Sequence, residues 1–225
     1  MTFQVAVFAS GRGSNFRVLA DHPDRGTGPH LWEVALLVSD REDAPVLELA
    51  RDRGIPSCIV PVSERSAHEV ARETLAALEE AQIQIVLLAG YLRLIPPPVV
   101  EAFRGRMLNI HPALLPGFGG KGMYGSKVHE AVLAAGVRIS GPTIHLVDER
   151  YDRGPILAQW PVPVLPGDTP ASLATRVNQV EHELFPAVVD ELARSLDEGR
   201  APRPIPGTGD ALRSHFSLTS TPDLP

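Results

Sequence analysis

The chain has 225 residues, of which 44% are hydrophobic and 21% charged, and its net charge is −6 at pH 7. This composition is ordinary for a globular protein, and the acidic balance argues against a nucleic-acid partner, which favours a basic excess. A single cysteine, Cys58, excludes an internal disulfide and is expected in the core. No signal peptide or membrane-spanning stretch is evident, so we expect a cytoplasmic protein without a membrane partner.

The first half of the chain alternates strand-like and helix-like segments. Ser66 and Glu69 match a capping box at one helix start, and Gly54 is placed to end the preceding helix. Such alternation predicts an α/β fold with a doubly wound, mostly parallel sheet. We expect strands at 3–9, 33–39, 57–60, 83–89 and 106–111, and helices at 45–53, 66–82 and 96–103, besides one that begins near Asn15 and ends at Pro23.

The second half predicts an extension of this sheet. Segments 141–147 and 156–164 are separated by too few residues for a helical crossover, so they should pair antiparallel. Pro161 and Pro163 place the later one at an edge. A helix is expected at 126–135, and a long C-terminal helix from Asp168 to about Arg194. We therefore expect one domain over residues 1–198 and a Pro-rich C-terminal tail over 199–225, loosely held from 207 onwards.

The strand-like run 107–111 ends in two polar side chains, Asn109 and His111. Side chains alternate along a strand, so these two should share a face, with Ile110 on the opposite one. Pro112 cannot donate to a ladder and should end the strand. Open α/β sheets bind ligands at the carboxyl ends of their strands, which makes this pair a candidate site. A polar strand end with a hydrogen-bonded histidine is the alternative interpretation.

A glycine turn, residues 11–16, separates the first strand from the first helix. Phe16 takes the place of the third glycine of a dinucleotide fingerprint, which disfavours a dinucleotide. A single phosphate fits better, because Gly13, Ser14 and Asn15 can each offer a backbone N–H to an anion. An ordinary helix start is the alternative.

Two further residues, His145 and Asp152, are candidates for the site only if they lie near His111. His145 lies on a predicted strand, where a hydrogen-bonded core histidine is the common case, and Asp152 lies in a charged turn of the usual solvated kind. A carboxylate near His111 would hold its ring in one orientation and favour its protonated form. The histidine spacing and the presence of only one thiol argue against zinc, and the lack of a Gly-x-Ser-x-Gly elbow argues against a Ser-His-Asp hydrolase.

Several spaced motifs agree with one another. They are Gly11-x-Gly13-Ser14-Asn15, the segment 89–95, Asn109-Ile110-His111-Pro112, Leu114-Leu115-Pro116, His145 with Asp152 and Gly154, and Arg176-Val177-Asn178 with Glu181 and His182. Together they resemble the 10-formyltetrahydrofolate-dependent formyltransferases over about residues 3–190. The opening glycine motif is similar to that of the members that act on glycinamide ribonucleotide. The glycine-rich loop 117–125 differs from that of some members.

The resemblance implies a Rossmann-like formyltransferase fold and a transfer without a covalent enzyme intermediate. The formyl group of the co-substrate 10-formyltetrahydrofolate would pass to the amine of N1-(5-phospho-D-ribosyl)glycinamide, in de novo purine (IMP) biosynthesis. Asn109 and His111 would stabilise the carbonyl oxygen as it becomes negative. Asp152 would keep His111 charged above its ordinary pKa of about 6.5 and assist proton transfer, and His145 would support these three.

The resemblance also implies which residues hold the two small-molecule substrates. The ribonucleotide would be bound by Gly13, Ser14, Asn15, Asn178 and Glu181. The folate would be bound by Leu92, Arg93, Leu94, Asn109, Val147 and Asp152. No metal and no nucleic acid are expected, and a homodimer is left open.

Three other functions compete with this one. A formyltetrahydrofolate hydrolase would be expected to carry an N-terminal regulatory domain, whereas this sequence begins at its first strand. A formyltransferase for initiator methionyl-tRNA would be expected to carry a basic C-terminal domain. A non-catalytic nucleotide-binding module would use the glycine turn without Asn109, His111 and Asp152.

Overall fold

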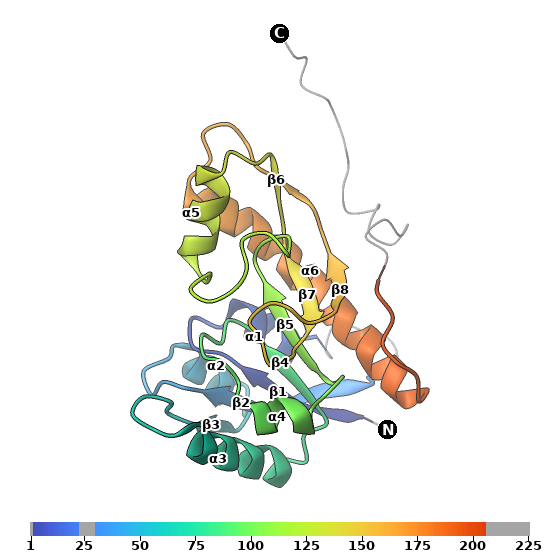
Figure 1. Ribbon diagram of the computed structural model, residues 1–225. Coiled ribbons are helices and arrows are strands. Elements are labelled where there is room, and N and C mark those ends of the chain that lie inside the picture. The colour runs from blue at the N-terminus through green and yellow to red at the C-terminus, as the bar shows by residue number, and fades with distance from the viewer. Residues whose placement is uncertain (1, 23–29, 206–225) are drawn as a thin grey trace.

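The computed structural model describes residues 2–22 and 30–205, and its centre is a seven-stranded sheet of order β3-β2-β1-β4-β5-β7-β8 (Figure 1). Strands β3, β2, β1, β4 and β5 pair in parallel, whereas β7 is antiparallel to both β5 and β8. This confirms the predicted mostly parallel sheet with an antiparallel extension. The strands are β1 (Phe3–Phe8), β2 (Trp32–Ser39), β3 (Ser57–Ile59), β4 (Ile85–Leu88), β5 (Met107–His111), β7 (Thr143–Leu146) and β8 (Ile156–Gln159).

Helices cover both faces of the sheet. Val5 and Val7 of β1 face the layer formed with α1, α2 and α6, and Ala6 and Phe8 face the layer formed with α3 and α4. Because neighbouring side chains of β1 enter opposite cores, this central strand is buried on both sides. The helices are α1 (Ser14–Ala20), α2 (Val46–Asp52), α3 (Ala67–Glu80), α4 (Pro97–Ala102), α5 (Ser126–Ala134) and α6 (Pro170–Asp197).

Side chains close in the sequence cap the N-terminal ends of two helices, α3 and α6. Ser66 and Glu69 form the predicted capping box of α3, in which each side chain bonds the backbone N–H of the other. Thr169 caps α6 in the same way with Ser172, and Pro170 follows at the first helical position. The predicted long C-terminal helix is therefore confirmed, although it continues to Asp197.

The predicted strand 156–164 is wrong as a single element. It divides into β8 and a short β9 (Val162–Pro163), and β9 pairs with β6 (Ile139–Ser140) in a separate two-stranded sheet. Pro161 lies between the two pieces and has no N–H for a ladder, which explains the break. Strand β8 keeps the predicted place at the sheet edge.

The start of the expected C-terminal tail returns to the domain. Arg200 pairs with Glu191 of α6, and the N–H of Ile205 donates to the carbonyl of Leu157 in β8 at 2.7 Å. The expectation of a loose tail from 207 onwards, and of a helix end at Pro23, lies outside the described residues. Within the described ranges, no helix has the length and apolar character needed to cross a membrane.

Candidate active site

A large cleft lies where the carboxyl ends of β1, β2, β4 and β5 meet, and it encloses about 1630 Å³. Ser10, Asp40, Gly90 and His111, which end or follow these strands, all line it. This is the edge at which open α/β sheets bind ligands. Single-ligand pockets are commonly about 300–1,000 Å³, so this cleft has room for two small molecules.

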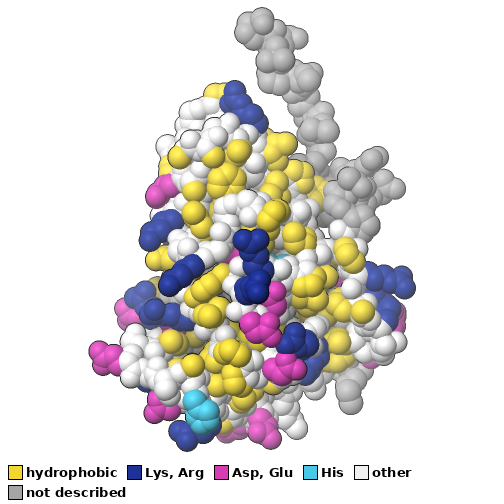
Figure 2. Space-filling view, in the orientation of Figure 1, with side chains coloured by type: hydrophobic (Ala, Val, Ile, Leu, Met, Phe, Trp, Pro, Cys, Tyr) yellow, Lys and Arg dark blue, Asp and Glu magenta, His cyan; other side chains and the backbone are white. Residues whose placement is uncertain are grey.

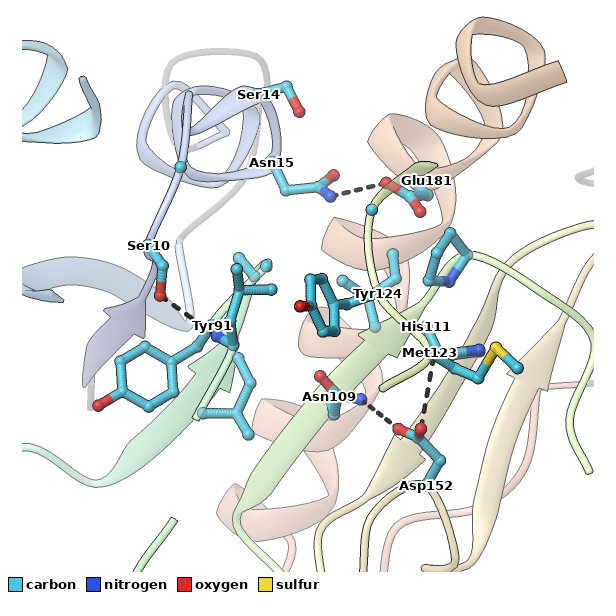
Figure 3. Close-up of a pocket in the computed structure, with 18 of the residues that line it drawn as sticks. Ser10, Ser14, Asn15, Tyr91, Asn109, His111, Met123, Tyr124, Asp152 and Glu181 are labelled. Carbon is cyan, nitrogen blue, oxygen red and sulfur yellow. Dashed lines mark hydrogen bonds and ion pairs between the residues drawn. The ribbon is translucent and has the colours of Figure 1, made fainter. Parts of the chain in front are cut away.

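Asn109 and His111 project into this cleft from the end of β5, as predicted (Figure 3). Ile110 between them is 6% exposed and packs into the core on the opposite face of the sheet. The alternation of a β-strand therefore places the amide and the imidazole side by side.

His145 determines how the Asn109 amide lies. Its Nδ1 is 2.8 Å from the Leu146 carbonyl oxygen, which can only accept, so Nδ1 carries the proton. In the neutral ring Nε2 is then an acceptor, and it receives a hydrogen bond from Asn109 Nδ2 at 3.0 Å. Asn109 Nδ2 also donates to Asp152 Oδ1 at 3.3 Å. His145 is thus a buried core histidine whose second nitrogen orients a cleft residue.

His111 is held between the loop after β5 and Asp152. Its Nε2 donates to the Phe118 carbonyl at 2.8 Å, and its Nδ1 lies 3.6 Å from Asp152 Oδ2. The side chain of His111 is 4% exposed. The predicted proximity of Asp152 and His111 is confirmed.

The structure does not support the predicted protonation of His111. Burial lowers the pKa of His111, and the opposing influences of Asp152 and the Phe118 carbonyl leave it below the ordinary value of 6.5. The ring is therefore neutral at pH 7 in the free protein. Desolvation outweighs a carboxylate that is near but not in hydrogen-bond contact.

Asp152 sits at a special backbone position, with φ of 54° in the left-handed region, which aspartate tolerates better than most residues. Its Oδ2 accepts a hydrogen bond from the Gly120 N–H at 2.7 Å. Burial alone would raise the pKa of Asp152, but His145, the Gly120 N–H and the nearby His111 outweigh burial and lower it. Asp152 is consequently an anion at neutral pH.

The loop 117–125 comes close to Asp152 because Gly119 has no side chain. A Cβ added at Gly119 would overlap the Leu115 side chain and approach Asp152 Cβ to 3.2 Å. Together with the bonds from Phe118 and Gly120, this close contact ties the loop to the pair His111 and Asp152.

The predicted phosphate-binding residues lie at the other end of the cleft. Gly13 precedes α1 with φ of 73°, and Ser14 and Asn15 form its first turn. Asn178 of α6 donates to Ser14 Oγ at 3.2 Å and to Glu181 Oε2 at 3.0 Å. The structure therefore brings together five residues from two distant parts of the sequence, Gly13, Ser14, Asn15, Asn178 and Glu181.

Glu181 is a buried acceptor in this group. It is 6% exposed and receives a further hydrogen bond from Asn15 Nδ2 at 2.8 Å. Burial raises the pKa of Glu181 against the lowering effect of its two amide donors. Asn15 Oδ1 is buried without a hydrogen-bond partner among the described residues. This end of the cleft therefore offers acceptors to a ligand that donates hydrogen bonds.

The predicted folate-binding residues border the cleft on a third side. Leu92 and Leu94 are 44% and 46% exposed, and the Leu92 N–H donates to Ser10 Oγ at 3.2 Å. Arg93 pairs with the buried Asp40 at 2.8 Å. Val147 follows β7 and lies in the lining on the Asp152 side. These exposed apolar side chains give a planar aromatic ligand a surface to lie against.

The charge of the cleft differs from that of the whole chain. Six cationic and four acidic side chains line it, whereas the chain carries −6. Lys and Arg side chains also lie across the middle of the face shown in Figure 2. A cationic excess in a cleft raises the local concentration of anions. The cations are Arg12, Arg17, Arg41, Arg93, Lys121 and Arg150, and the acids are Asp40, Asp148, Asp152 and Glu181.

No group of three or more His, Cys, Asp or Glu side chains is placed to hold a metal ion in residues 2–22 and 30–205. Cys58 is half-buried against the α3 and α4 layer, and burial raises the pKa of its thiol. It lies outside the residues that line the cleft.

Comparison with known proteins matches this arrangement to one family. The model of the formyl transferase family matches residues 3–189, which is most of the chain. The chain belongs to the formyl transferase family. The phosphoribosylglycinamide formyltransferase of Bacillus subtilis is 36% identical over 190 residues, with 83% of this chain and 93% of that protein covered.

Other members of the family agree with this assignment. The chloroplastic phosphoribosylglycinamide formyltransferase of Arabidopsis thaliana is 50% identical over 188 residues, which cover 83% of this chain and 64% of that protein. This chain thus spans less than two thirds of that plant relative. The crystal structure of glycinamide ribonucleotide transformylase 1 from Geobacillus kaustophilus superposes with a TM-score of 0.77 at 41% identity, covering 86% of this chain and 100% of that one.

Some residues of the cleft escaped the sequence-based interpretation. Tyr124 and Gly120 line the cleft from the glycine-rich loop, whose sequence differs from that of some family members and did not predict a place for it. Phe118 of the same loop contacts His111 through its carbonyl. Asp40 and Ser10 follow the first two strands. The position of Asp40 and Ser10 after parallel strands could have predicted their place in the cleft, because ligand-binding residues gather at the carboxyl ends of such strands.

Proposed function

We propose that this chain transfers the formyl group of 10-formyltetrahydrofolate to the amine of N1-(5-phospho-D-ribosyl)glycinamide, which yields formylglycinamide ribonucleotide and tetrahydrofolate in de novo purine biosynthesis. The observation that carries the proposal is the convergence of Asn109, His111 and Asp152 at the end of β5, where Asp152 lies 3.3 Å from the Asn109 amide and 3.6 Å from the His111 ring. The names of the similar proteins support the same reaction.

In this reaction the acceptor amine attacks the formyl carbon, and the carbonyl oxygen becomes negative. A hydrogen-bond donor at that oxygen stabilises the transition state. Asn109 is suited to this role because its 3.3 Å bond to Asp152 is the longer of its two contacts. The formyl oxygen would take this amide hydrogen while His145 keeps the other. The second donor would be the Nε2–H of His111, shared between the Phe118 carbonyl and the formyl oxygen.

The amine loses one proton as its bond to the formyl carbon forms, and the folate nitrogen gains one as its bond to that carbon breaks. Asp152 is an anion beside His111 and can stabilise the positive charge on the attacking amine. Its lowered pKa makes it a weak base. This favours a relay of the proton through an ordered water over its retention on Asp152.

The end of the cleft near α1 suits the acceptor ribonucleotide. Backbone N–H groups at Gly13, Ser14 and Asn15 would hold its phosphate, aided by the nearby cations of the cleft. Glu181, Asn178 and the unpartnered Asn15 Oδ1 would receive hydrogen bonds from its amine, amide or sugar hydroxyls. The acceptor ribonucleotide has the groups that these residues would bind, namely a phosphate at one of its own ends and several hydrogen-bond donors in the rest of the molecule.

The third side of the cleft suits the folate. Leu92, Arg93 and Leu94 would contact the pteridine, and Val147 and Asp152 would close over it from the loop after β7. Asn109 would face both substrates at the point of transfer. The carboxylates of the folate would be attracted by the cationic excess of the cleft.

We further propose that residues 1–198 form one formyltransferase domain, which the end of α6 at Asp197 supports. The Pro-rich segment 199–225 would follow this domain, with Arg200 and Ile205 returning to contact α6 and β8. Cytoplasmic location stays a prediction, and two plant relatives are named chloroplastic. A homodimer likewise stays a prediction.

The test is to mix the protein with 10-formyltetrahydrofolate and to follow tetrahydrofolate formation with and without glycinamide ribonucleotide. We expect formation that depends on the ribonucleotide and is lost in His111→Ala. Formation at the same rate without the ribonucleotide would identify a hydrolase instead. No tetrahydrofolate under either condition would favour the nucleotide-binding module.

A further inference from the structure

The glycine-rich loop 117–125 carries a large aromatic side chain into the cleft. Tyr124 is 42% exposed and lines the cleft. Its ring lies between Asn15 and Glu181 on one side and Asn109 on the other (Figure 3). It therefore stands between the proposed phosphate-binding end and the proposed point of transfer.

Tyr124 is held from the side that leads into α5. Lys127 Nζ lies 4.8 Å from the centre of the Tyr124 ring and 3.3 Å from its hydroxyl. A cation over an aromatic face is a favourable contact that leaves the opposite face of the ring available. The free face and the ring edge belong to the cleft lining.

The base of the loop is tied to the catalytic end of the cleft. Phe118 bonds His111, Gly120 bonds Asp152, and Gly119 packs without a side chain against Asp152. These contacts place the loop relative to the residues of β5. The position of Tyr124 at the far end of the same short loop is thus defined relative to Asn109.

An exposed tyrosine in a cleft that also carries polar and charged side chains is well suited to recognise a ligand. Tyrosine offers a large apolar face with only two side-chain torsions to restrict, and its hydroxyl can donate or accept. A molecule whose phosphate is held at Ser14 and Asn15, and whose amine reaches Asn109, must extend past Tyr124. The part of the acceptor between phosphate and amine is the sugar.

We propose that Tyr124 is a specificity-determining residue for the acceptor, whose ring packs against the sugar of the ribonucleotide and separates the acceptor side of the cleft from the folate side. This inference rests on the proposed function, because it assumes the same acceptor. It assigns a role to the loop that distinguishes this chain from some members of its family.

The variants Tyr124→Ala and Tyr124→Phe test the inference through steady-state kinetics with each substrate varied in turn. Losing the buried face of one aromatic ring should raise the KM for glycinamide ribonucleotide about tenfold in Tyr124→Ala. The KM for 10-formyltetrahydrofolate should stay within about twofold, because the ring is expected to contact only one substrate. Tyr124→Phe keeps the face and should remain closer to the wild type than Tyr124→Ala.

Ile139→Ala is the matched control, since Ile139 is also an exposed large side chain, at 56%, and lies outside the cleft lining. Its KM values should equal those of the wild type, and thermal unfolding of all variants should coincide. An unchanged KM for the ribonucleotide in Tyr124→Ala, or an equal rise in both KM values, would overturn the inference.

Calorimetric titration of glycinamide ribonucleotide into the protein without folate separates this inference from the proposed function. Weaker binding to Tyr124→Ala than to the wild type would support the role of Tyr124 even if no formyl transfer occurred. Equal binding to both proteins, or no binding to the wild type, would contradict it.

Discussion

Asn109 and His145 face each other across the register of β5 and β7, and Asn109 Nδ2 donates to His145 Nε2 at 3.0 Å. The proton on His145 Nδ1 is held by the Leu146 carbonyl, so Nε2 is left to accept. A backbone carbonyl thereby sets the tautomer of a buried ring, and the ring sets the orientation of an amide in the cleft. In the proposed reaction His145 would therefore act through Asn109, as a positioning residue.

The first prediction concerns this positioning. His145→Leu removes the acceptor for the Asn109 amide, which is then free to rotate. We expect kcat to fall by about 10- to 100-fold, because small misplacements of a reacting group have effects of this size. His145→Gln retains an acceptor and should keep more activity than His145→Leu. Steady-state kinetics check this, with both KM values expected near wild type. Equal losses in the two variants would mean that His145 serves only packing.

The second prediction concerns Asn109 as a donor. Asn109→Ala removes the proposed donor to the developing oxyanion and should lower kcat by about 10²–10³-fold. Asn109 is only partly buried, so thermal unfolding should shift little. Asn109→Asp has nearly the same shape but no amide hydrogen, and it should be at least as slow. Activity of Asn109→Asp near the wild-type level would show that shape, rather than donation, matters at this position.

The third prediction concerns the protonation of His111. Burial lowers its pKa, whereas the charge of Asp152 acts to raise it. In a titration followed by NMR, we expect the pKa of His111 to lie below 6.5 in the free protein. Asp152→Asn removes the negative charge and should lower the pKa of His111 further. A pKa that rises or stays constant in Asp152→Asn would show that Asp152 does not act on this ring.

The fourth prediction concerns Gly13 at the start of α1. Its φ of 73° lies in the left-handed region, and an added Cβ would come within 2.5 Å of Val46 Cγ2. Gly13→Ala should therefore lower the free energy of unfolding by about 1–3 kcal/mol and raise the KM for the ribonucleotide. Gly11→Ala is the matched stability control, because a Cβ there meets nothing within 4 Å. Equal unfolding of both variants in urea would contradict this explanation.

Much of the fold was accessible from the sequence because its elements carry strong local signals. The apolar run 83–89, the capping box at Ser66 and the proline after Thr169 each correspond to an observed element. Strand β6 was missed, and β9 was not separated from β8, because two residues are too short to show a period. Their pairing depends on contacts between distant segments, which local patterns do not record.

The site was predictable to a similar degree. Side-chain alternation placed Asn109 and His111 on one face, and motif resemblance selected Asp152 from a turn with three carboxylates. The pKa of His111 was not predictable, because it depends on burial in the folded protein. Tyr124 was missed because its place in the cleft follows from the path of a loop without periodic structure.

The central claim is that the formyl group passes from folate to the ribonucleotide. The most direct measurement follows an isotope-labelled formyl group of 10-formyltetrahydrofolate during a single turnover with glycinamide ribonucleotide, for the wild type and Asn109→Ala. We predict that the wild type places the label in formylglycinamide ribonucleotide in equal amount to the tetrahydrofolate formed, and that Asn109→Ala gives the same product more slowly. Label recovered as free formate, with the ribonucleotide unlabelled, would contradict the claim.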